Sequence, residues 1–339
     1  PVHPADVPRL PALVKLLARA DRLHGPASHP LTALSDRFGM RSERPQDLPS
    51  APFCRLFDDP DGDASGYWLH AEPVHLRPDR DQLLLFDARH LDLHPEDAEA
   101  LVAEFNAHFG ADGLRLQAPV PDRWYLRLDS DPDIRTTPLD LASGRGIRPL
   151  LPKGEEATRW AALLNETQML FHQSPVNQER EGSGRITVSG IWPWGGGRLP
   201  VTPLRSAYGL VLAEHPFAVG LARAAGVNDG PLPEDDGVLT LDESGKGLLV
   251  FWDRLWPAVL DADPDAWVLG IKRLEHLAAG LLEAVGRGRA ERLDLDPCDG
   301  GLFRVTRRGL RRFWRRAPAF ATAARQGSAK HEAGSPRQA

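Results

Sequence analysis

Cysteine is scarce in this sequence, which holds only Cys54 and Cys298 among its 339 residues. Two cysteines can form at most one disulfide, fewer than a secreted chain held together by disulfides normally carries. Long apolar runs are also lacking, since none approaches the roughly 18–20 residues that a membrane-spanning helix needs, and there is no signal peptide. These absences predict a soluble, cytoplasmic protein without a membrane partner.

The chain also lacks an excess of positive charge. The chain has 41 Lys and Arg against 47 Asp and Glu, a net charge of −6, so it lacks the basic excess of a general nucleic-acid binder. Its 42% hydrophobic and 26% charged residues are close to the average for globular proteins, which allows a sizeable core. The sequence starts at Pro1 rather than Met, which leaves room for an upstream segment bearing a first strand.

The spacing of apolar residues predicts a mixed α/β chain. Helical periodicity predicts helices at residues 11–20, 29–37, 95–109, 154–172 and 266–285. Alternating or β-branched runs predict strands at 67–75, 83–87, 114–116, 124–128, 186–192, 210–212, 239–241, 248–252, 291–294 and 302–305. Residues 43–66 and 129–153 are rich in Pro, Asp and Gly and are expected to be loops.

The order of these elements suggests an insertion in a larger domain. Strand, strand, helix, strand and strand follow one another within about 60 residues, a pattern typical of a compact α+β unit. We therefore expect residues 1–66 to form the N-terminal part of a core domain, 67–150 an inserted α+β subdomain, 151–316 the remainder of the core and 317–339 a disordered tail.

A basic run lies near the end of the chain, with six arginines among the eleven residues 306–316. As a functional feature it would bind an anionic partner, such as another protein. The alternative is a solvated terminal element that anchors Leu310, Phe313 and Trp314 in the core, and the acidic chain favours this second interpretation.

Residues 172–200 carry the densest group of candidate functional side chains. Several polar residues lie between a predicted helix and a strand, and the strand ends in three glycines, which permit close backbone approach to a ligand or to a neighbouring element. The arginines would bind an anion and the tryptophans would form walls. The predicted ligand-binding set is His172, Asn177, Arg180, Arg185, Trp192, Trp194, Gly195 and Gly197. The alternative is a tightly packed turn with both tryptophans in the core.

The run HQSPVNQER…VSGIWPWGGGRLP, followed by Tyr208–Leu210, resembles the archaeal-type cofactor-independent phosphoglycerate mutases. It is more similar still to a group of bacterial mutase-like proteins without a demonstrated reaction, often described as regulatory. The resemblance implies the alkaline-phosphatase superfamily fold, an α/β architecture whose mixed core sheet is flanked by helices and carries an inserted α+β subdomain. It also implies two divalent ions, usually Mn²⁺ or Zn²⁺, held by Asp and His, and a serine that is transiently phosphorylated.

The sequence departs from this family where metal ligands are expected. Residues 251–257 keep Asp253 without a histidine, and residues 297–300 keep Asp299 without one, so these two are weak metal candidates. Losing several ligands should abolish a two-metal transfer. We therefore expect a catalytically degenerate, non-enzymatic binding or regulatory protein for a phosphorylated metabolite, with no cofactor. The alternatives are an active phosphomutase or phosphatase that uses Mn or Zn, and a protein-interaction scaffold.

Overall fold

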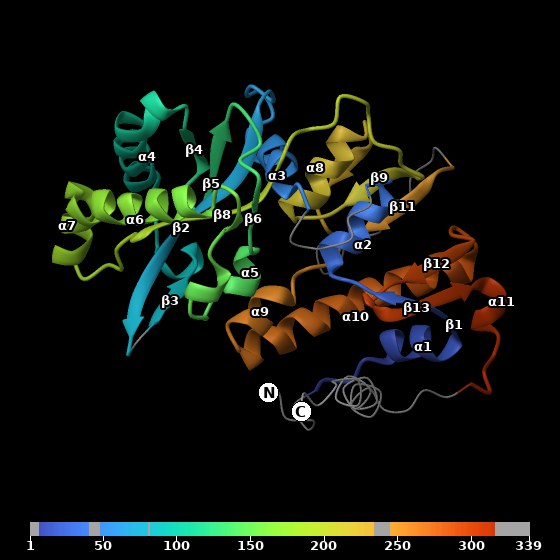
Figure 1. Cartoon of the computed structure of the whole chain (residues 1–339). Coiled ribbons are helices and arrows are strands. Elements are labelled where there is room, and N and C mark those ends of the chain that lie inside the picture. The colour runs from blue at the N-terminus through green and yellow to red at the C-terminus, as the bar shows by residue number, and fades with distance from the viewer. Residues whose placement is uncertain (1–6, 41–47, 81, 234–244, 316–339) are drawn as a thin grey trace, which may run out of the picture. The chain divides into compact units, whose positions relative to one another are not determined.

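The computed structural model describes residues 7–40, 48–80, 82–233 and 245–315 (Figure 1). The described residues fall into two compact units. Unit 1 lies within Pro1–Ala33, Tyr208–Glu214 and Gly230–Ala339, and unit 2 lies within Leu34–Ala207 and His215–Asp229. Helices and several sheets occur together, so the expected mixed α/β class is confirmed.

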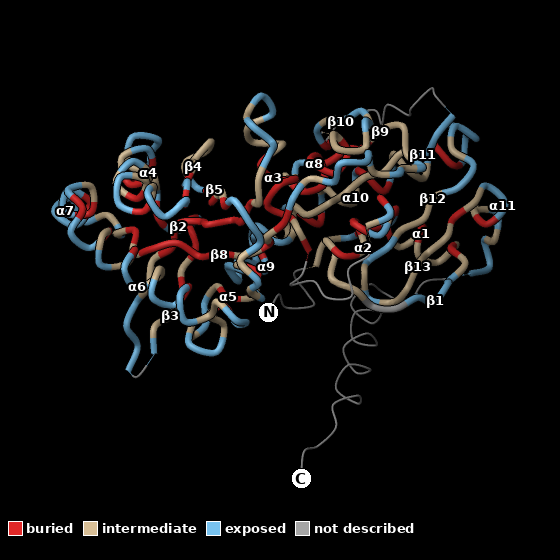
Figure 2. The backbone as a smooth tube through the Cα atoms, turned by 45° about the horizontal axis from the view of Figure 1, so that its top comes forward, coloured by how far each residue is buried: buried red, intermediate tan, exposed pale blue. Residues whose placement is uncertain are grey.

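Unit 2 is built on a five-stranded antiparallel sheet. Its members are β2 (Tyr67–Asp79), β3 (Gln82–Phe86), β4 (Arg115–Val120), β5 (Arg123–Leu128) and β8 (Gly190–Gly197). The strand order is β3-β2-β5-β4, and β8 pairs with β2. Strand β2 is the one that contacts three others, and Figure 2 shows that much of β2 and β8 is buried.

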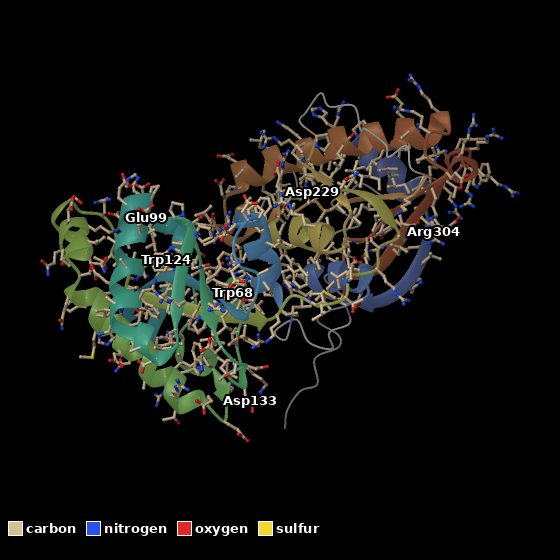
Figure 3. The ribbon with its side chains drawn as sticks, turned by 90° about the horizontal axis from the view of Figure 1, so that it is seen from above. Trp68, Glu99, Trp124, Asp133, Asp229 and Arg304 are labelled. Atoms are coloured by element: carbon tan, nitrogen blue, oxygen red, sulfur yellow. The ribbon has the colours of Figure 1, made fainter. Side chains whose placement is uncertain are left out.

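Two helices cover one face of this sheet, α4 (Pro95–Phe109) and α6 (Ala157–Gln173). Side chains of a strand alternate between its two faces, so Leu69 and Ala71 of β2 join this core. Figure 3 shows Trp124 of β5 inside the unit and Glu99 on the outer side of α4. The next helix, α7 (Pro175–Gly182), follows α6 directly and leads to β8.

Helix α3 (Ser50–Asp58) lies against the opposite face of the sheet, where it contacts β2 and β8. Helix α8 (Pro216–Ala224) packs on α3, with the rings of Phe53 and Phe217 meeting edge to face at 5.9 Å. A Cβ on Gly220 would lie 2.0 Å from the carbonyl oxygen of Phe53. Glycine at this position therefore sets how closely the two helices approach.

In unit 1, the N-terminal segment packs with the C-terminal segment, in a sheet and in a pair of helices. Strands β1 (Asp21–Ala27), β13 (Asp299–Thr306) and β12 (Arg292–Leu295) form an antiparallel sheet. Helices α1 (Pro11–Arg19) and α10 (Pro264–Arg287) share a core with it, and the Glu275 carboxylate accepts the N–H groups of Ala12 and Leu13 at 2.5 and 2.9 Å. These bonds satisfy donors that a first helical turn leaves free.

One parallel strand pair and several short helices, strands and turns remain. Strands β9 (Tyr208–Leu212) and β11 (Gly247–Val250) pair in parallel. The remaining elements are α2 (Pro30–Arg37), β6 (Ile134–Arg135), α5 (Leu139–Ala142), β7 (Lys153–Gly154), β10 (Asn228–Gly230), α9 (Trp256–Leu260), α11 (Arg307–Leu310) and the 3₁₀ turns Ala88–His90, Gly110–Asp112 and Arg148–Leu150. No helix in the described ranges is both long and apolar enough to cross a bilayer.

Several sequence expectations need correction. The loop predicted over 43–66 is wrong, because α3 lies inside it; this nine-residue helix is short and contains Pro52, so its composition resembles a loop. The strand predicted at 186–192 begins later, at Gly190. The predicted core positions of Phe313 and Trp314 are also wrong, since these side chains are 78% and 66% exposed. The strand at 239–241 and the tail at 317–339 lie outside the described residues.

The units divide the chain at positions other than those expected. Residues 67–150 share their sheet with β8 and their core with α6, and α3 covers the other face. The unit that contains the expected insertion therefore extends from Leu34 to Ala207 and includes α8.

The contact between α3 and α8 gives a stability prediction. Gly220→Ala should raise helix propensity by about 1 kcal/mol, but the collision with the Phe53 carbonyl should outweigh this and lower the free energy of unfolding by about 1–3 kcal/mol. Urea unfolding measures the difference. Gly182→Ala is the control, because a Cβ there meets nothing within 4 Å; equal effects of the two changes would contradict this account of the helix contact.

Candidate functional site

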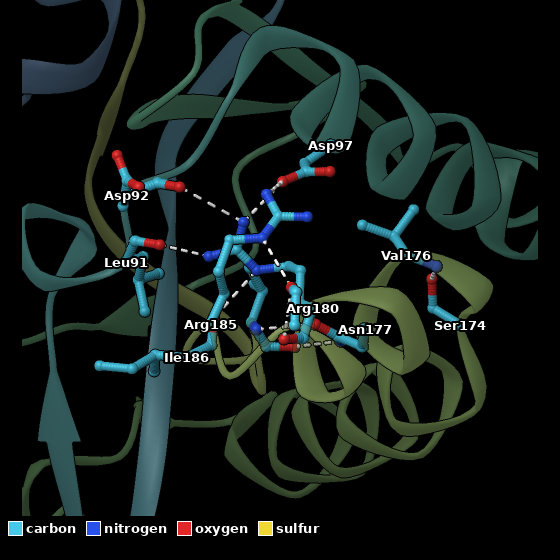
Figure 4. Close-up of polar contacts among 11 residues, drawn as sticks. Leu91, Asp92, Asp97, Ser174, Val176, Asn177, Arg180, Arg185 and Ile186 are labelled. Carbon is cyan, nitrogen blue, oxygen red and sulfur yellow. Dashed lines mark hydrogen bonds and ion pairs between the residues drawn. The ribbon is translucent and has the colours of Figure 1, made fainter.

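The predicted ligand-binding arginines lie where α7 meets the start of α4 (Figure 4). The guanidinium of Arg180 is completely buried and donates to the Asp97 carboxylate at 2.6 Å and to the Ile186 carbonyl at 2.9 Å. It also donates to the carbonyl of Leu91. Arg185 is partly exposed and donates to the same Asp97 carboxylate at 3.0 Å. Protein groups therefore account for the hydrogen bonding of Arg180.

Asn177 ties the end of α6 to the segment that enters β8. Its amide nitrogen donates to the carbonyls of Phe171 and Val188 at 2.7 and 2.8 Å, and its amide oxygen accepts the Val188 N–H at 2.9 Å. His172 is exposed on α6. Asn177 and Arg180 thus position the loop before β8, while ligand binding by His172 and Arg185 stays a prediction.

The remaining predicted residues lie further along β8. The indole N–H of Trp192 donates to the Thr137 carbonyl at 2.8 Å, and its ring packs in an apolar cluster with Val74 and Leu85. Gly197 lies against Pro49, which precedes α3. Since a strand rises about 3.3 Å per residue, the glycine-rich end of β8 is far from Asn177. The structure therefore divides the predicted set into two groups.

Trp194 and Gly195 lie in what we call the His70 cluster, formed by Ser50, His70, Glu72, Trp194 and Gly195. The rings of His70 and Trp194 stack with centroids 4.1 Å apart. The indole N–H of Trp194 donates to Glu72 Oε2 at 2.6 Å, and the other carboxyl oxygen lies 3.6 Å from His70 Nδ1. Neither ring nitrogen of His70 has a hydrogen-bond partner among the residues that the structure describes.

Gly195 brings the start of α3 next to His70. Its φ of +64° lies in the left-handed region that favours glycine. A Cβ there would be 2.3 Å from Ser50 Oγ, 3.0 Å from His70 Cδ2 and 3.6 Å from the backbone nitrogen of Ala51. The Ser50 hydroxyl is buried and has no hydrogen-bond partner within the described ranges. The Ser50 hydroxyl, the edge of the His70 ring and the Ala51 backbone nitrogen thus lie close to Gly195.

Burial controls the charges of this cluster. It raises the pKa of Glu72 to about 8, against the opposing effects of the Trp194 hydrogen bond and of Arg123. It lowers the pKa of His70 to about 3, with His215 and Arg123 adding to the shift. At pH 7 both side chains are therefore neutral. Leaving buried polar atoms without partners costs free energy, which marks the cluster as a candidate site.

The charged side chains next to the His70 cluster are paired with one another. Asp58, at the end of α3, accepts two hydrogen bonds from Arg123 at 2.9 and 2.7 Å and one from the Tyr125 hydroxyl at 2.6 Å. Burial raises the pKa of the Cys54 thiol well above its ordinary value. The thiol is therefore protonated at neutral pH and is a poor nucleophile.

Sequence reasoning missed Ser50, His70 and Glu72. Ser50 was missed because α3 was taken for a loop. His70 and Glu72 could have been recognised from the sequence. Together with Trp68 they occupy every second position of β2 and so share one face of a strand whose other face is apolar. Figure 3 places Trp68 inside unit 2 on this strand.

The two metal candidates contact protein groups in unit 1. Burial raises the pKa of Asp253, and the neighbouring Glu214 carboxylate adds to this. Asp299 accepts the N–H of Gly301 at 2.9 Å at the start of β13. Within the described ranges no three His, Cys, Asp or Glu side chains are grouped so that they could hold a metal ion.

Glu72 gives a prediction about pH. Its pKa is higher in the folded protein, so the unfolded state loses this proton from about pH 4.5 while the folded state keeps it up to about pH 8. The contribution of Glu72 to the free energy of unfolding should therefore fall across this window, by at most about 1.4 kcal/mol for each unit of pKa difference. The lowered pKa of His70 adds an opposite rise below about pH 6.5, which the parent and the Glu72 variant share. Glu72→Gln keeps an acceptor for Trp194 and should remove this fall in urea unfolding between pH 5 and pH 9. Glu99→Gln, an exposed change on α4, is the control and should unfold as the parent does. A parent and Glu72→Gln with parallel pH profiles would contradict the assignment.

No protein-family model matches the chain. Similarity to individual proteins is clear. The chain is 27% identical over 157 residues to the 2,3-bisphosphoglycerate-independent phosphoglycerate mutase of Methanosarcina barkeri, a match that covers 44% of this chain and 39% of the relative. It is 28% identical over 159 residues to a probable mutase of the same name from Geobacter sulfurreducens, covering 46% of this chain and 40% of the relative.

The fold has a counterpart among solved structures. The PH0037 protein from Pyrococcus horikoshii matches 80% of this chain and 71% of its own with a TM-score of 0.50 at 14% identity, which shows similarity of fold alone. The sequence matches span about two fifths of the length of the curated relatives. They agree with the resemblance seen in residues 172–210, and the chain is thus a distant relative of the cofactor-independent phosphoglycerate mutases.

Proposed function

We propose that this protein is a non-catalytic, mutase-like binding protein that holds a phosphorylated metabolite at the His70 cluster. The observation that carries the proposal is a pair of buried side chains beside the left-handed Gly195, Ser50 and His70, whose polar atoms have no hydrogen-bond partner among the described residues. The names of the relatives identify phosphoglycerate as their substrate. A phosphorylated three-carbon acid is therefore the first ligand to test.

The groups around Gly195 suit the oxygens of a phosphate. The Ser50 hydroxyl and a ring N–H of neutral His70 can each donate one hydrogen bond. The N–H of Ala51 lies in the first turn of α3, where backbone donors and the helix dipole favour an anion. Glu72 is neutral at pH 7, so it does not repel one. Because Ser50 and His70 are enclosed, binding requires the start of α3 to separate from β8.

The proposed lack of catalysis rests on the residues where the family resemblance leads us to expect metal ligands. Asp253 stands there without a histidine between residues 251 and 257, and Asp299 without one between 297 and 300. Two-metal transfer needs a full set of ligands that clamps both the attacking and the leaving oxygen. An active Mn- or Zn-dependent phosphomutase is the competing function, and the same experiment tests it.

The test is titration calorimetry with 3-phosphoglycerate and with inorganic phosphate, in EDTA and in Mn²⁺. We expect 3-phosphoglycerate to bind in EDTA. A ligand concentration of 100 times the dissociation constant should then raise the free energy of unfolding by about 2.7 kcal/mol. Ser50→Ala should weaken this binding about tenfold, since it removes a hydrogen bond to a charged group. Ser130→Ala, an exposed serine of the same unit, is the control and should bind as the parent does.

Three results would overturn the proposal. Turnover of 3-phosphoglycerate that requires Mn²⁺ would make the protein an enzyme. Loss of binding in Arg185→Ala with full binding in Ser50→Ala would place the ligand at α7, as the sequence predicted. Failure of the parent protein to bind either ligand in EDTA or in Mn²⁺ would leave the interaction scaffold as the better function.

A further inference from the structure

The end of unit 1 exposes two large aromatic side chains beside several arginines. We call residues 307–315 the arginine–aromatic segment. Phe313 and Trp314 are 78% and 66% exposed, and their rings meet edge to face at 5.3 Å. Scattered apolar side chains on a surface are ordinary, but two adjacent exposed aromatic rings indicate an interaction site.

The segment is firmly attached to unit 1. Arg312 donates to both carboxylate oxygens of Asp21, and Arg315 donates to the Ala20 carbonyl at 3.0 Å. Arg19 donates to the Leu310 carbonyl at 2.9 Å, and Thr306 Oγ1 accepts the Gly309 N–H at 3.1 Å to cap α11. The aromatic pair is therefore presented on an ordered support beside the β1-β13-β12 sheet, on which Figure 3 labels Arg304.

The arginines divide into two groups by their partners. Arg312 and Arg315 pair with Asp21 and hold the segment. Arg308 and Arg311 are exposed, and neither forms an ion pair with any residue that the structure describes. The side chain of Arg307 lies 3.4 Å from the position that a Cβ on Gly288 would take, at the end of α10. Two exposed arginines without an ion pair to a described residue thus lie within six residues of the exposed aromatic pair in the sequence.

We propose that the arginine–aromatic segment docks unit 1 on the surface of an anionic phospholipid bilayer. Arg308 and Arg311 would pair with lipid phosphate and carboxylate groups, and Phe313 and Trp314 would enter the headgroup region. Aromatic rings prefer this interface, and basic residues near it add electrostatic attraction to anionic lipids. This role is separate from ligand binding at the His70 cluster, and it departs from the expectation, drawn from the sequence, of a protein without a membrane partner.

A bilayer fits better than a nucleic acid for two reasons. Single-stranded nucleic acids stack their bases on open ring faces along a basic groove, whereas here the edge of one ring covers a face of the other. The chain carries a net charge of −6, which opposes a long polyanion over the whole protein. A membrane needs only the segment to approach, because attraction falls off within about 10 Å of the surface.

The test is sedimentation of the full chain with vesicles of 70% phosphatidylcholine and 30% phosphatidylserine, and with pure phosphatidylcholine vesicles. We expect binding to the anionic vesicles that weakens at 0.5 M NaCl, because salt screens exposed charges. Arg308→Ala with Arg311→Ala should weaken partitioning about 25-fold, at about fivefold for each arginine. Phe313→Ser with Trp314→Ser should weaken it more than about tenfold.

The controls separate this surface from general charge effects. Arg148→Ala with Arg159→Ala removes two exposed arginines from unit 2 and should leave partitioning within about twofold, since these residues lie outside the segment. Circular dichroism of each variant checks folding. Equal binding to both vesicle types, no sedimentation with either, or tight binding of a 20-nucleotide uridine oligomer that displaces the vesicles would each overturn the proposal.

Discussion

The two-sided nature of strand β2 is the constraint on which unit 2 depends. Successive side chains of a strand point to opposite faces, so Leu69 and Ala71 enter the core under α4 and α6 while His70 and Glu72 face α3. Pairing with β8 fixes the register, with His70 opposite Trp194. A slip of one residue would place the polar set under α4 and α6 and the apolar set against α3. The same register that forms the core therefore also assembles the His70 cluster.

The cluster contains buried polar groups of Ser50 and His70 that have no hydrogen-bond partner among the described residues. A buried histidine whose ring nitrogens lack a hydrogen-bond partner within the described ranges opposes folding, as does burial of the Glu72 carboxyl. Phenylalanine and glutamine would fill similar volumes at lower cost. Strain of this kind persists in proteins where the surrounding packing supports it, and it gathers at functional sites. The close approach at Gly195 adds a second constraint at the same point, which is why we assign function here rather than at Arg180.

The sequence predicts long periodic elements well and short ones poorly. Helices α1, α4, α6 and α10 follow from their apolar spacing, as does the hairpin of β4 and β5. Helix α3 could not be recognised in the same way, because nine residues that include a proline give little periodic signal and its stability comes from packing on β2 and α8. Two residues of the proposed site, Trp194 and Gly195, belong to the ligand-binding set expected from the sequence, and their role in binding stays a prediction. Ser50 is some 145 residues away along the chain, and no local pattern links the two.

Arginine shows most clearly why residue type alone does not identify a site. Arg180 lies in a conspicuous polar run and was expected to bind a ligand, and each of its three side-chain nitrogens has a protein partner, two of them Leu91 and Asp97 from a distant part of the chain. Arg308 lies in a run that composition alone suggests is a solvated face, and it is exposed, without an ion pair to any described residue, five residues before Phe313 in the sequence. Contacts with residues far away in the sequence determine whether an arginine already has protein hydrogen-bond partners. We therefore place the proposed binding site where the fold encloses a polar group and leaves it without a partner, a condition that Ser50 and His70 meet within the part of the chain that the structure describes.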